Sequence, residues 1–294
     1  MVDVLIAYAA GTERLMRACL DSLARHEAGV DYAVTVVTDQ RTADEAVTLF
    51  GSDVERLVSY AVSDYAVGSQ RHAFVLDEYM KGASGLVLTM DSDVLPVADG
   101  WLGELCSMVS AETMLPGIRW PWEPPGSDVT GIEARVRSNQ NWNNTWVACQ
   151  LVEPEWVRAM SLKYASGDDT GFALAAQVRE MGLRMPGWLP TRCALPEGGM
   201  DPELNRMMCV AYGDKVVHIG GGSGKATGRV VDADGAYDKA VERVLSEGAD
   251  WILNDDESHL YEFTREDEVV EYKMRGMYNE MKRYLQTHDS LFDK

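Results

Sequence analysis

Asp91 and Asp93 stand one residue apart at the end of an apolar run, Leu86-Val-Leu-Thr-Met90, that is typical of a buried strand. Residues i and i+2 of an extended chain point to the same side, so both carboxylates can face one ion beyond the strand. Two hard oxygen donors suit Mn²⁺ or Mg²⁺, which take few carboxylates, some water and the phosphate oxygens of a substrate. The alternative is that Asp-Ser-Asp only forms the turn that ends the strand.

A second acidic pair, Asp168 and Asp169, precedes an apolar helical pattern that starts at Phe172. A carboxylate held over a reacting carbon can accept the proton of an attacking hydroxyl, so either residue is a candidate general base. Acids at a helix start also cap free N–H groups and favour the helix dipole, and this purely structural role is the alternative.

His218 follows a short apolar strand and precedes a glycine-rich stretch that ends in Lys225. A neutral imidazole there is a candidate third metal ligand, while the glycines let backbone amides approach a diphosphate that Lys225 would neutralise. The stretch is not a Walker A loop, because Ala226 follows Lys225 where that motif requires Ser or Thr.

Alternating strands and helices predict an α/β fold with a mostly parallel sheet that helices cover on both faces. We expect one domain over 1–228, made of the halves 1–100 and 101–228, and a helical C-terminal extension (229–294) packed on it. Predicted strands span 2–9, 32–38, 56–62, 85–90, 146–152 and 216–219, and predicted helices cover 15–23, 42–50, 70–81 and the chain from about 237.

The order of these features resembles glycosyltransferases of the GT-A fold from Val2 to about Gly228. A first strand-loop-helix is followed by a second strand ending in Asp39, by Gly68-Ser-Gln-Arg-His-Ala73, and by a strand that ends in Asp-x-Asp. The resemblance implies a DXD motif in which Asp93 binds the metal and Asp91 touches the metal or the ribose. It makes 1–100 the nucleotide-sugar half and 101–228 the acceptor half. It also places six residues at the nucleotide sugar: Ala9, Asp39, Arg71, His72, Asp91 and Lys225.

The resemblance leaves the stereochemistry open. In family-2-type members an acidic pair before a helix carries the general base, which is the place of Asp168 and Asp169 and which favours inversion. The stretch from His218 to Lys225 is similar to the His-x-x-Gly-x-x-Lys element of glycogenin-like members, with the lysine one residue further along. That element favours retention.

Six of the eight tryptophans lie between Trp120 and Trp188. A tryptophan ring packs well against the apolar C–H face of a sugar, so this region is a candidate acceptor site. Core packing is the alternative for each tryptophan taken singly. The candidates are Trp120, Trp122, Trp142 and Trp188.

Composition limits the classes of partner. The 294-residue chain has a formal charge of −20, which disfavours nucleic acid and anionic membranes unless basic residues gather in one groove. Candidates for such a groove are Arg135, Arg137, Arg179, Arg184 and Arg192. No apolar run approaches the roughly 20 residues of a membrane span, and the five scattered cysteines are typical of reduced thiols, so we expect a cytoplasmic protein.

The function that the sequence predicts is metal-dependent transfer of a hexosyl or pentosyl group from a UDP- or GDP-sugar to an acceptor hydroxyl. The acceptor could be a glycan, a small molecule or a hydroxylated base of viral DNA, and the oligomeric state stays open. One alternative is a nucleotidyltransferase of related fold, although Ala9-Ala-Gly-Thr-Glu-Arg14 lacks the usual basic glycine-rich loop. The other is a non-catalytic carbohydrate-binding protein.

Overall fold

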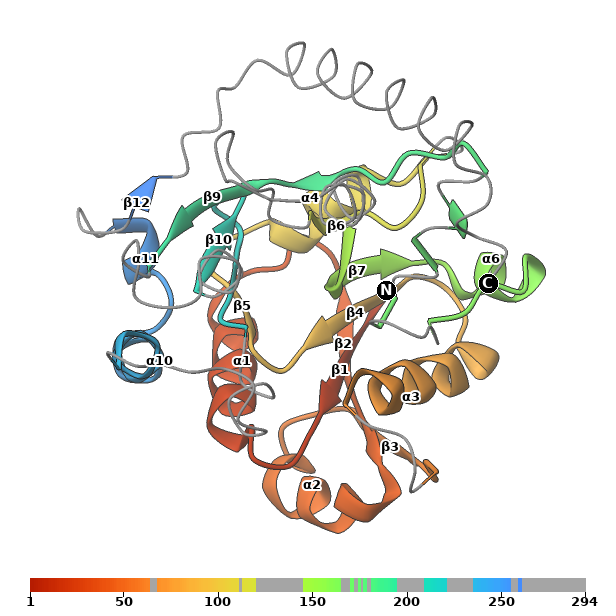
Figure 1. Cartoon of the computed structure of the whole chain (residues 1–294), viewed down its shortest axis with the longest axis horizontal. Coiled ribbons are helices and arrows are strands. Elements are labelled where there is room, and N and C mark those ends of the chain that lie inside the picture. Colours follow the sequence, from red (N-terminus) through yellow and green to blue (C-terminus); the bar gives the residue numbers. More distant parts are fainter. Residues whose placement is uncertain are drawn as a thin grey trace, which may run out of the picture.

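A computed structural model describes residues 1–63, 68–110, 113–119, 145–164, 170–171, 174–175, 177–178, 181–194, 209–220, 235–254 and 259–260. Within these residues the chain forms a seven-stranded central sheet in the order β3-β2-β1-β4-β7-β6-β8 (Figure 1). Its strands are β1 (Val2–Tyr8), β2 (Tyr32–Asp39), β3 (Arg56–Tyr60), β4 (Val87–Asp91), β6 (Gly117–Arg119), β7 (Thr145–Val152) and β8 (Gly187–Trp188).

The first four strands in the order are parallel, and β7 pairs antiparallel with β4. The prediction of an α/β fold with a mostly parallel central sheet flanked by helices is therefore confirmed. The helices within the described residues are α1 (Glu13–Arg25), α2 (Ala43–Phe50), α3 (Gly68–Gly82), α4 (Trp101–Ser107), α6 (Pro154–Ala159), α10 (Ala236–Glu247) and α11 (Trp251–Asn254). A short 3₁₀ turn spans Gln40–Thr42.

Alternation along β1 divides the core into two layers. Val4 and Ile6 point into the layer that contains α1 and α10, whereas Leu5 points into the layer that contains α3. Both layers need apolar side chains because helices cover both faces of the sheet. Figure 1 shows α1 and α3 on opposite sides of the central strands.

A second sheet, which the sequence did not predict, has the order β12-β9-β10-β11-β5. It consists of β5 (Val94–Pro96), β9 (Pro190–Cys193), β10 (Val210–Tyr212), β11 (Val216–His218) and β12 (His259–Leu260). The chain leaves β4 at Asp91 and enters β5 at Val94, so Asp-Ser-Asp connects strands of two different sheets. Val94 and Leu95 are fully buried, and this burial keeps β5 in the second sheet.

The predicted C-terminal extension contributes α10, α11 and β12 in its described part. Tyr237, Val244 and Ile252 pack into the same core layer as α1, and Arg14 on α1 forms an ion pair with Glu242 on α10 (2.6 Å). Residues 261–294 of the predicted helical extension lie outside the described part of the chain.

Among the described residues, no helix is both long enough and apolar enough to cross a membrane.

Candidate metal and substrate site

Three side chains with metal-ligating atoms converge where β4 passes into β5. Carboxylate oxygens of Asp91 and Asp93 and an imidazole nitrogen of His218 all lie within 4.8 Å of one another. Asp91 ends β4, and Asp93 precedes β5. Ligands of open α/β sheets collect beyond the carboxyl ends of the parallel strands, which is where this group lies.

Pairing of β11 with β5 brings His218 to the acidic pair. His218 lies opposite Val94 in the antiparallel register, and the Ile219 N–H donates to the Asp93 carbonyl (2.9 Å). The His218 Nε2 atom then lies 3.4 Å from Asp93 Oδ1. The imidazole is 2% exposed, and the Trp146 ring meets it edge-on with centroids 4.5 Å apart. The ring is therefore fixed on several sides.

The two carboxylates set the electrostatics of the site. Burial works against a charged imidazole, but Asp93 and then Asp91 favour the charge, and the net result is a raised pKa of His218. Burial, and after it the charges of nearby carboxylates, raise the pKa of two buried thiols, Cys19 on α1 and Cys149 on β7. Burial first, and then Asp91, raises the pKa of Cys149 to about 12, so this thiol stays protonated.

The donor set fits a divalent cation. With metal–ligand bonds of about 2.1 Å, adjacent ligand atoms of an octahedral ion are about 3.0 Å apart and opposite ones about 4.2 Å apart. The 3.4 Å between His218 Nε2 and Asp93 Oδ1 lies within that interval. Among the described residues, the buried Nδ1 atom of His218 has no hydrogen-bond partner, and Nε2 is the nitrogen that faces the carboxylates. Asp91 and Asp93 keep some exposure, so water can complete the coordination.

A second polar group lies at the end of β2, where Asp39 binds two arginines. Arg41, in the 3₁₀ turn, donates from its backbone N–H (3.0 Å) and its guanidinium to the Asp39 carboxylate. The Arg71 guanidinium lies 3.7 Å from the same carboxylate. Hydrogen bonds from Arg41 are the main cause of a lowered pKa of Asp39, and the nearby charges of Arg41 and Arg71 add to it. The sequence analysis singled out Asp39 and Arg71 but not Arg41, whose only signal was its place two residues after the end of β2.

His72 lies beside one of the candidate metal ligands. It follows Arg71 on α3, and its Nε2 atom lies 3.5 Å from Asp91 Oδ1. The sequence resemblance placed both Arg71 and His72 at the nucleotide sugar. In the structure, Arg71 meets Asp39, whereas His72 meets a candidate metal ligand.

Ala9 lies in the exposed turn between β1 and α1. Its carbonyl accepts hydrogen bonds from the Thr12 N–H (3.2 Å) and the Thr12 hydroxyl (2.7 Å). The hydroxyl of Ser92, between the two aspartates, donates to the Thr12 hydroxyl (3.3 Å). The turn at Ala9 is thus tied to the Asp-Ser-Asp connection.

Several predicted residues lie outside the described part of the chain, namely Asp168, Asp169, Lys225, Trp120, Trp122, Trp142, Arg135, Arg137 and Arg179. Trp188 is described, and it is a core residue. It is 5% exposed, and its indole N–H donates to Glu104 (2.8 Å). A ring buried in this way offers no open face to an acceptor sugar, so core packing explains Trp188.

Tyr164 precedes Asp168 and Asp169 in the sequence, Gly171 follows them, and both of these residues are described. The Gly171 N–H donates to the Tyr164 carbonyl (3.1 Å), and Gly171 packs against Val147 on β7. Because Met90 pairs with Cys149 in antiparallel register, Val147 lies near the carboxyl end of β4. The two ends of this segment therefore lie at the edge of the sheet that carries Asp91.

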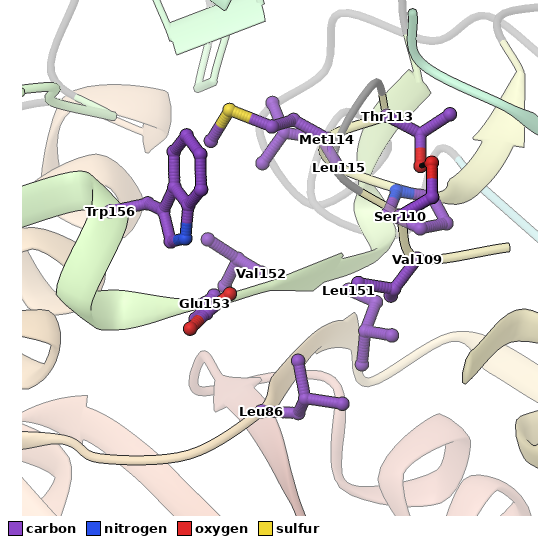
Figure 2. A pocket seen from close by; sticks show the side chains of 11 residues that line it. Leu86, Val109, Ser110, Thr113, Met114, Leu115, Leu151, Val152, Glu153 and Trp156 are labelled. Carbon is purple, nitrogen blue, oxygen red and sulfur yellow. Dashed lines mark hydrogen bonds between the residues drawn. The ribbon is translucent and has the colours of Figure 1, made fainter. Parts of the chain in front are cut away.

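A separate small hollow is partly open to solvent, and Figure 2 shows the side chains that line it. Its lining is mostly apolar and includes Leu86, Met114, Leu151 and Trp156. Leu86 and Val152 lie at the start of β4 and the end of β7, so the hollow is at the opposite edge of the sheet from Asp91. It is distinct from the candidate metal site.

No protein-family model matches the chain, and no curated protein matches it. Solved structures that resemble it include glycosyltransferases, as the sequence resemblance led us to expect. The glycosyltransferase GlyE of Streptococcus pneumoniae aligns at 16% identity over 55% of this chain and 37% of its own, with a TM-score of 0.35. Its apo form is matched over 44% of its own chain, so this chain spans less than half of GlyE.

Two further structures resemble the chain. The mannosyltransferase PcManGT of Pyrobaculum calidifontis, in complex with GDP-Man and Mn²⁺, aligns at 16% identity over 86% of this chain and 72% of its own, with a TM-score of 0.45. The 4-diphosphocytidyl-2C-methyl-D-erythritol synthase of Anaerococcus prevotii aligns at 13% identity over 64% of this chain and 88% of its own, with a TM-score of 0.43. Likenesses this distant do not assign an activity.

Proposed function

We propose that this protein is a metal-dependent glycosyltransferase that moves a sugar from a nucleoside diphosphate sugar to an acceptor hydroxyl. The observation that carries the proposal is the convergence of Asp91, Asp93 and His218 beyond the carboxyl end of a parallel sheet. Two carboxylates and an imidazole with room for water match a cation that also binds phosphate oxygens, such as Mn²⁺ or Mg²⁺.

Within this proposal, Asp91, Asp93 and His218 hold the cation, and His72 orients Asp91. The cation would offset the negative charge that develops on the departing diphosphate. The lowered pKa of Asp39 keeps this carboxylate ionised, so it accepts hydrogen bonds from the nucleoside. Arg71 donates hydrogen bonds to the nucleoside. Metal and nucleoside groups lie at the ends of β4 and β2, on either side of β1.

Asp168 or Asp169 is the proposed general base, which would accept the proton of the acceptor hydroxyl as the new bond forms. The anchoring of Tyr164 and Gly171 near the carboxyl end of β4 supports this role. Direct attack assisted by such a base inverts the anomeric configuration. The His218 element favours retention, so the proposal covers both outcomes, and product NMR decides between them.

The acceptor is proposed only as a hydroxyl compound, such as a glycan, a small molecule or a hydroxylated base of viral DNA. The formal charge of −20 favours the uncharged acceptors over DNA. An acceptor screen with and without modified DNA, read by mass spectrometry, separates these classes.

The central test is incubation of the protein with UDP- and GDP-sugars, with and without Mn²⁺ or Mg²⁺, followed by product analysis. We expect metal-dependent release of a nucleoside diphosphate, as hydrolysis or transfer, and its loss in Asp93→Ala. Release of inorganic diphosphate from a nucleoside triphosphate would instead support a nucleotidyltransferase. Binding of free glycans without any nucleotide binding would support a carbohydrate-binding protein, and full activity in chelator would contradict the proposed mechanism.

A further inference from the structure

The side chains of Trp146 and His218 come from different sheets and meet beside the acidic pair. Their ring centroids are 4.5 Å apart and their planes are at 88°, which is an edge-to-face arrangement. Aromatic pairs of this kind have centroids about 4.5 to 7 Å apart, so this pair lies at the close end of the range. The contact joins the central sheet to the second sheet at the candidate metal site.

Strand pairing places the backbones of both residues. His218 on β11 is held between β10 and β5, and Trp146 on β7 pairs with Ile118 on β6. The last pair between β4 and β7 is Met90 with Cys149, and Trp146 lies three residues beyond Cys149. Because β7 is antiparallel to β4, this position is past the carboxyl end of β4. The fold therefore carries the Trp146 ring to the edge where the candidate ligands converge.

Strand pairing fixes the backbone of His218 but leaves the orientation of its ring to side-chain contacts. Rotation of a histidine ring about its χ2 torsion is soft, with broad and roughly two-fold preferences. Histidines that bind metals usually limit this rotation by donating the second ring N–H to a carboxylate, a carbonyl or water. The described residues give the buried Nδ1 of His218 no such hydrogen bond. The perpendicular Trp146 ring instead limits the rotation by direct contact.

We propose that Trp146 is a positioning residue that holds the His218 imidazole with Nε2 directed at the cation site. In this orientation Nε2 lies 3.4 Å from Asp93 Oδ1. The inference rests on the proposed function, in which His218 binds a divalent cation together with Asp91 and Asp93. A ring that rotates more freely presents Nε2 for only part of the time, and the affinity for the cation falls by that fraction.

The test compares Trp146→Leu, Trp146→Phe and Trp156→Leu in the full chain without an affinity tag. Leu removes the ring and keeps an apolar side chain, whereas Phe keeps an aromatic ring that can meet the imidazole. Trp156 on α6 is the matched control, because it is also a partly buried tryptophan and lines the hollow at the opposite edge of the sheet.

Thermal unfolding of each variant shows whether it is folded at the assay temperature. If Trp146→Leu is not folded, Trp146→Met replaces it, because the flexible methionine side chain fills irregular space in a core without supplying a ring.

Calorimetry with Ni²⁺ alone and with Mn²⁺ alone separates an effect on the imidazole from an effect on the whole site. Imidazole is a favourable ligand for Ni²⁺, whereas oxygen ligands suit Mn²⁺. We expect Trp146→Leu to lower the Ni²⁺ affinity about 10-fold, as is typical of residues that orient ligands, and the Mn²⁺ affinity by a smaller factor. Trp146→Phe should keep most of the Ni²⁺ affinity, and Trp156→Leu should match the wild type. Equal losses for the two ions, or an unchanged Ni²⁺ affinity in Trp146→Leu, would overturn the proposal.

Ring motion in the metal-free protein keeps this inference separate from the proposed function. Relaxation of ¹³C in the His218 ring, measured by NMR, should give an order parameter of about 0.85 in the wild type and below about 0.6 in Trp146→Leu. If the wild type binds neither Ni²⁺ nor Mn²⁺, the proposed function fails, and the order parameters still decide whether Trp146 holds the ring. An unchanged order parameter in Trp146→Leu overturns the proposal whatever the metal affinities are.

Discussion

The Nε2 atom of His218 lies 3.4 Å from Oδ1 of Asp93, although the two residues belong to distant parts of the sequence. The contact depends on the antiparallel pairing of β11 with β5 and on the Ile219 N–H that donates to the Asp93 carbonyl. Because backbone hydrogen bonds fix both residues, the fold itself holds these two proposed ligand atoms close together. A prearranged site loses less conformational entropy on binding.

Substitution of Asp93 by Ala should abolish the metal site while the fold is retained. We expect the Mn²⁺ affinity, measured by calorimetry, to fall by more than about 100-fold, beyond the usual effect of residues that only orient ligands. Asp21→Ala, at an exposed position on α1, is the control for the loss of one negative charge. Equal Mn²⁺ affinity in the two variants would contradict the assignment of Asp93.

Substitution of His72 by Gln should weaken the Mn²⁺ site less than loss of Asp93 does. His72 contacts Asp91 from α3 and is outside the group of three converging ligands. Residues that orient metal ligands typically contribute about 10- to 100-fold to affinity. Calorimetry with Mn²⁺ measures the effect, and Glu78→Ala is the control on the same helix. If the variant keeps its Mn²⁺ affinity but has a raised nucleotide Kd, His72 contacts the nucleotide and does not orient a metal ligand.

Substitution of Gly171 by Ala should destabilise the segment that carries the acidic pair. Gly171 has a φ of +79°, and an added Cβ would lie 3.1 Å from the Val147 Cβ. We expect a loss of about 1–3 kcal/mol in the free energy of unfolding, together with a lower kcat. Gly182→Ala is the matched control, because its φ is +74° and an added Cβ would meet nothing within 4 Å. Equal destabilisation by both variants in urea unfolding would show that packing on Val147 contributes nothing.

The ion pair and hydrogen bond of Glu104 predict a pH dependence of stability. Trp188 donates to Glu104, Lys215 lies 3.1 Å away, and these two partners lower the pKa of Glu104 despite partial burial. A carboxyl with a lowered folded pKa stabilises the protein above its unfolded pKa, and this contribution is lost as the pH falls through the folded pKa. Glu104→Gln should therefore reduce stability at pH 7 and match the wild type at low pH.

The expected size is below about 1 kcal/mol, because Glu104 is 42% exposed and solvent screens the charge. Urea unfolding of the wild type and Glu104→Gln at pH 7, and at steps below pH 4.5, measures the difference. Asp21→Asn controls for general charge effects. A difference that grows as the pH falls would have the wrong sign for this contact.

Local sequence patterns were sufficient for the four parallel strands β1 to β4 and for β7 of the central sheet, but not for the short strands β6 and β8. Apolar and β-branched runs predicted β1, β2 and β4 to within two residues of their observed ends. The same runs placed Asp39 and the Asp91–Asp93 pair at strand ends, and these ends meet because parallel strands share one carboxyl edge. An unbroken apolar run followed by a polar residue is a local pattern, so the position of these carboxylates at strand ends can be predicted without information on distant contacts.

Tertiary structure decided the rest of the site. The three-residue strand β5 is too short to show a periodic pattern in the sequence. It forms a strand because β11 pairs with it and its side chains are buried. That pairing brings His218 to Asp93. Packing of elements that are far apart in the sequence also decides that His72 meets Asp91 and that Trp188 is buried. The sequence by itself determined which residues could bind a cation, and long-range strand pairing decided which of them meet.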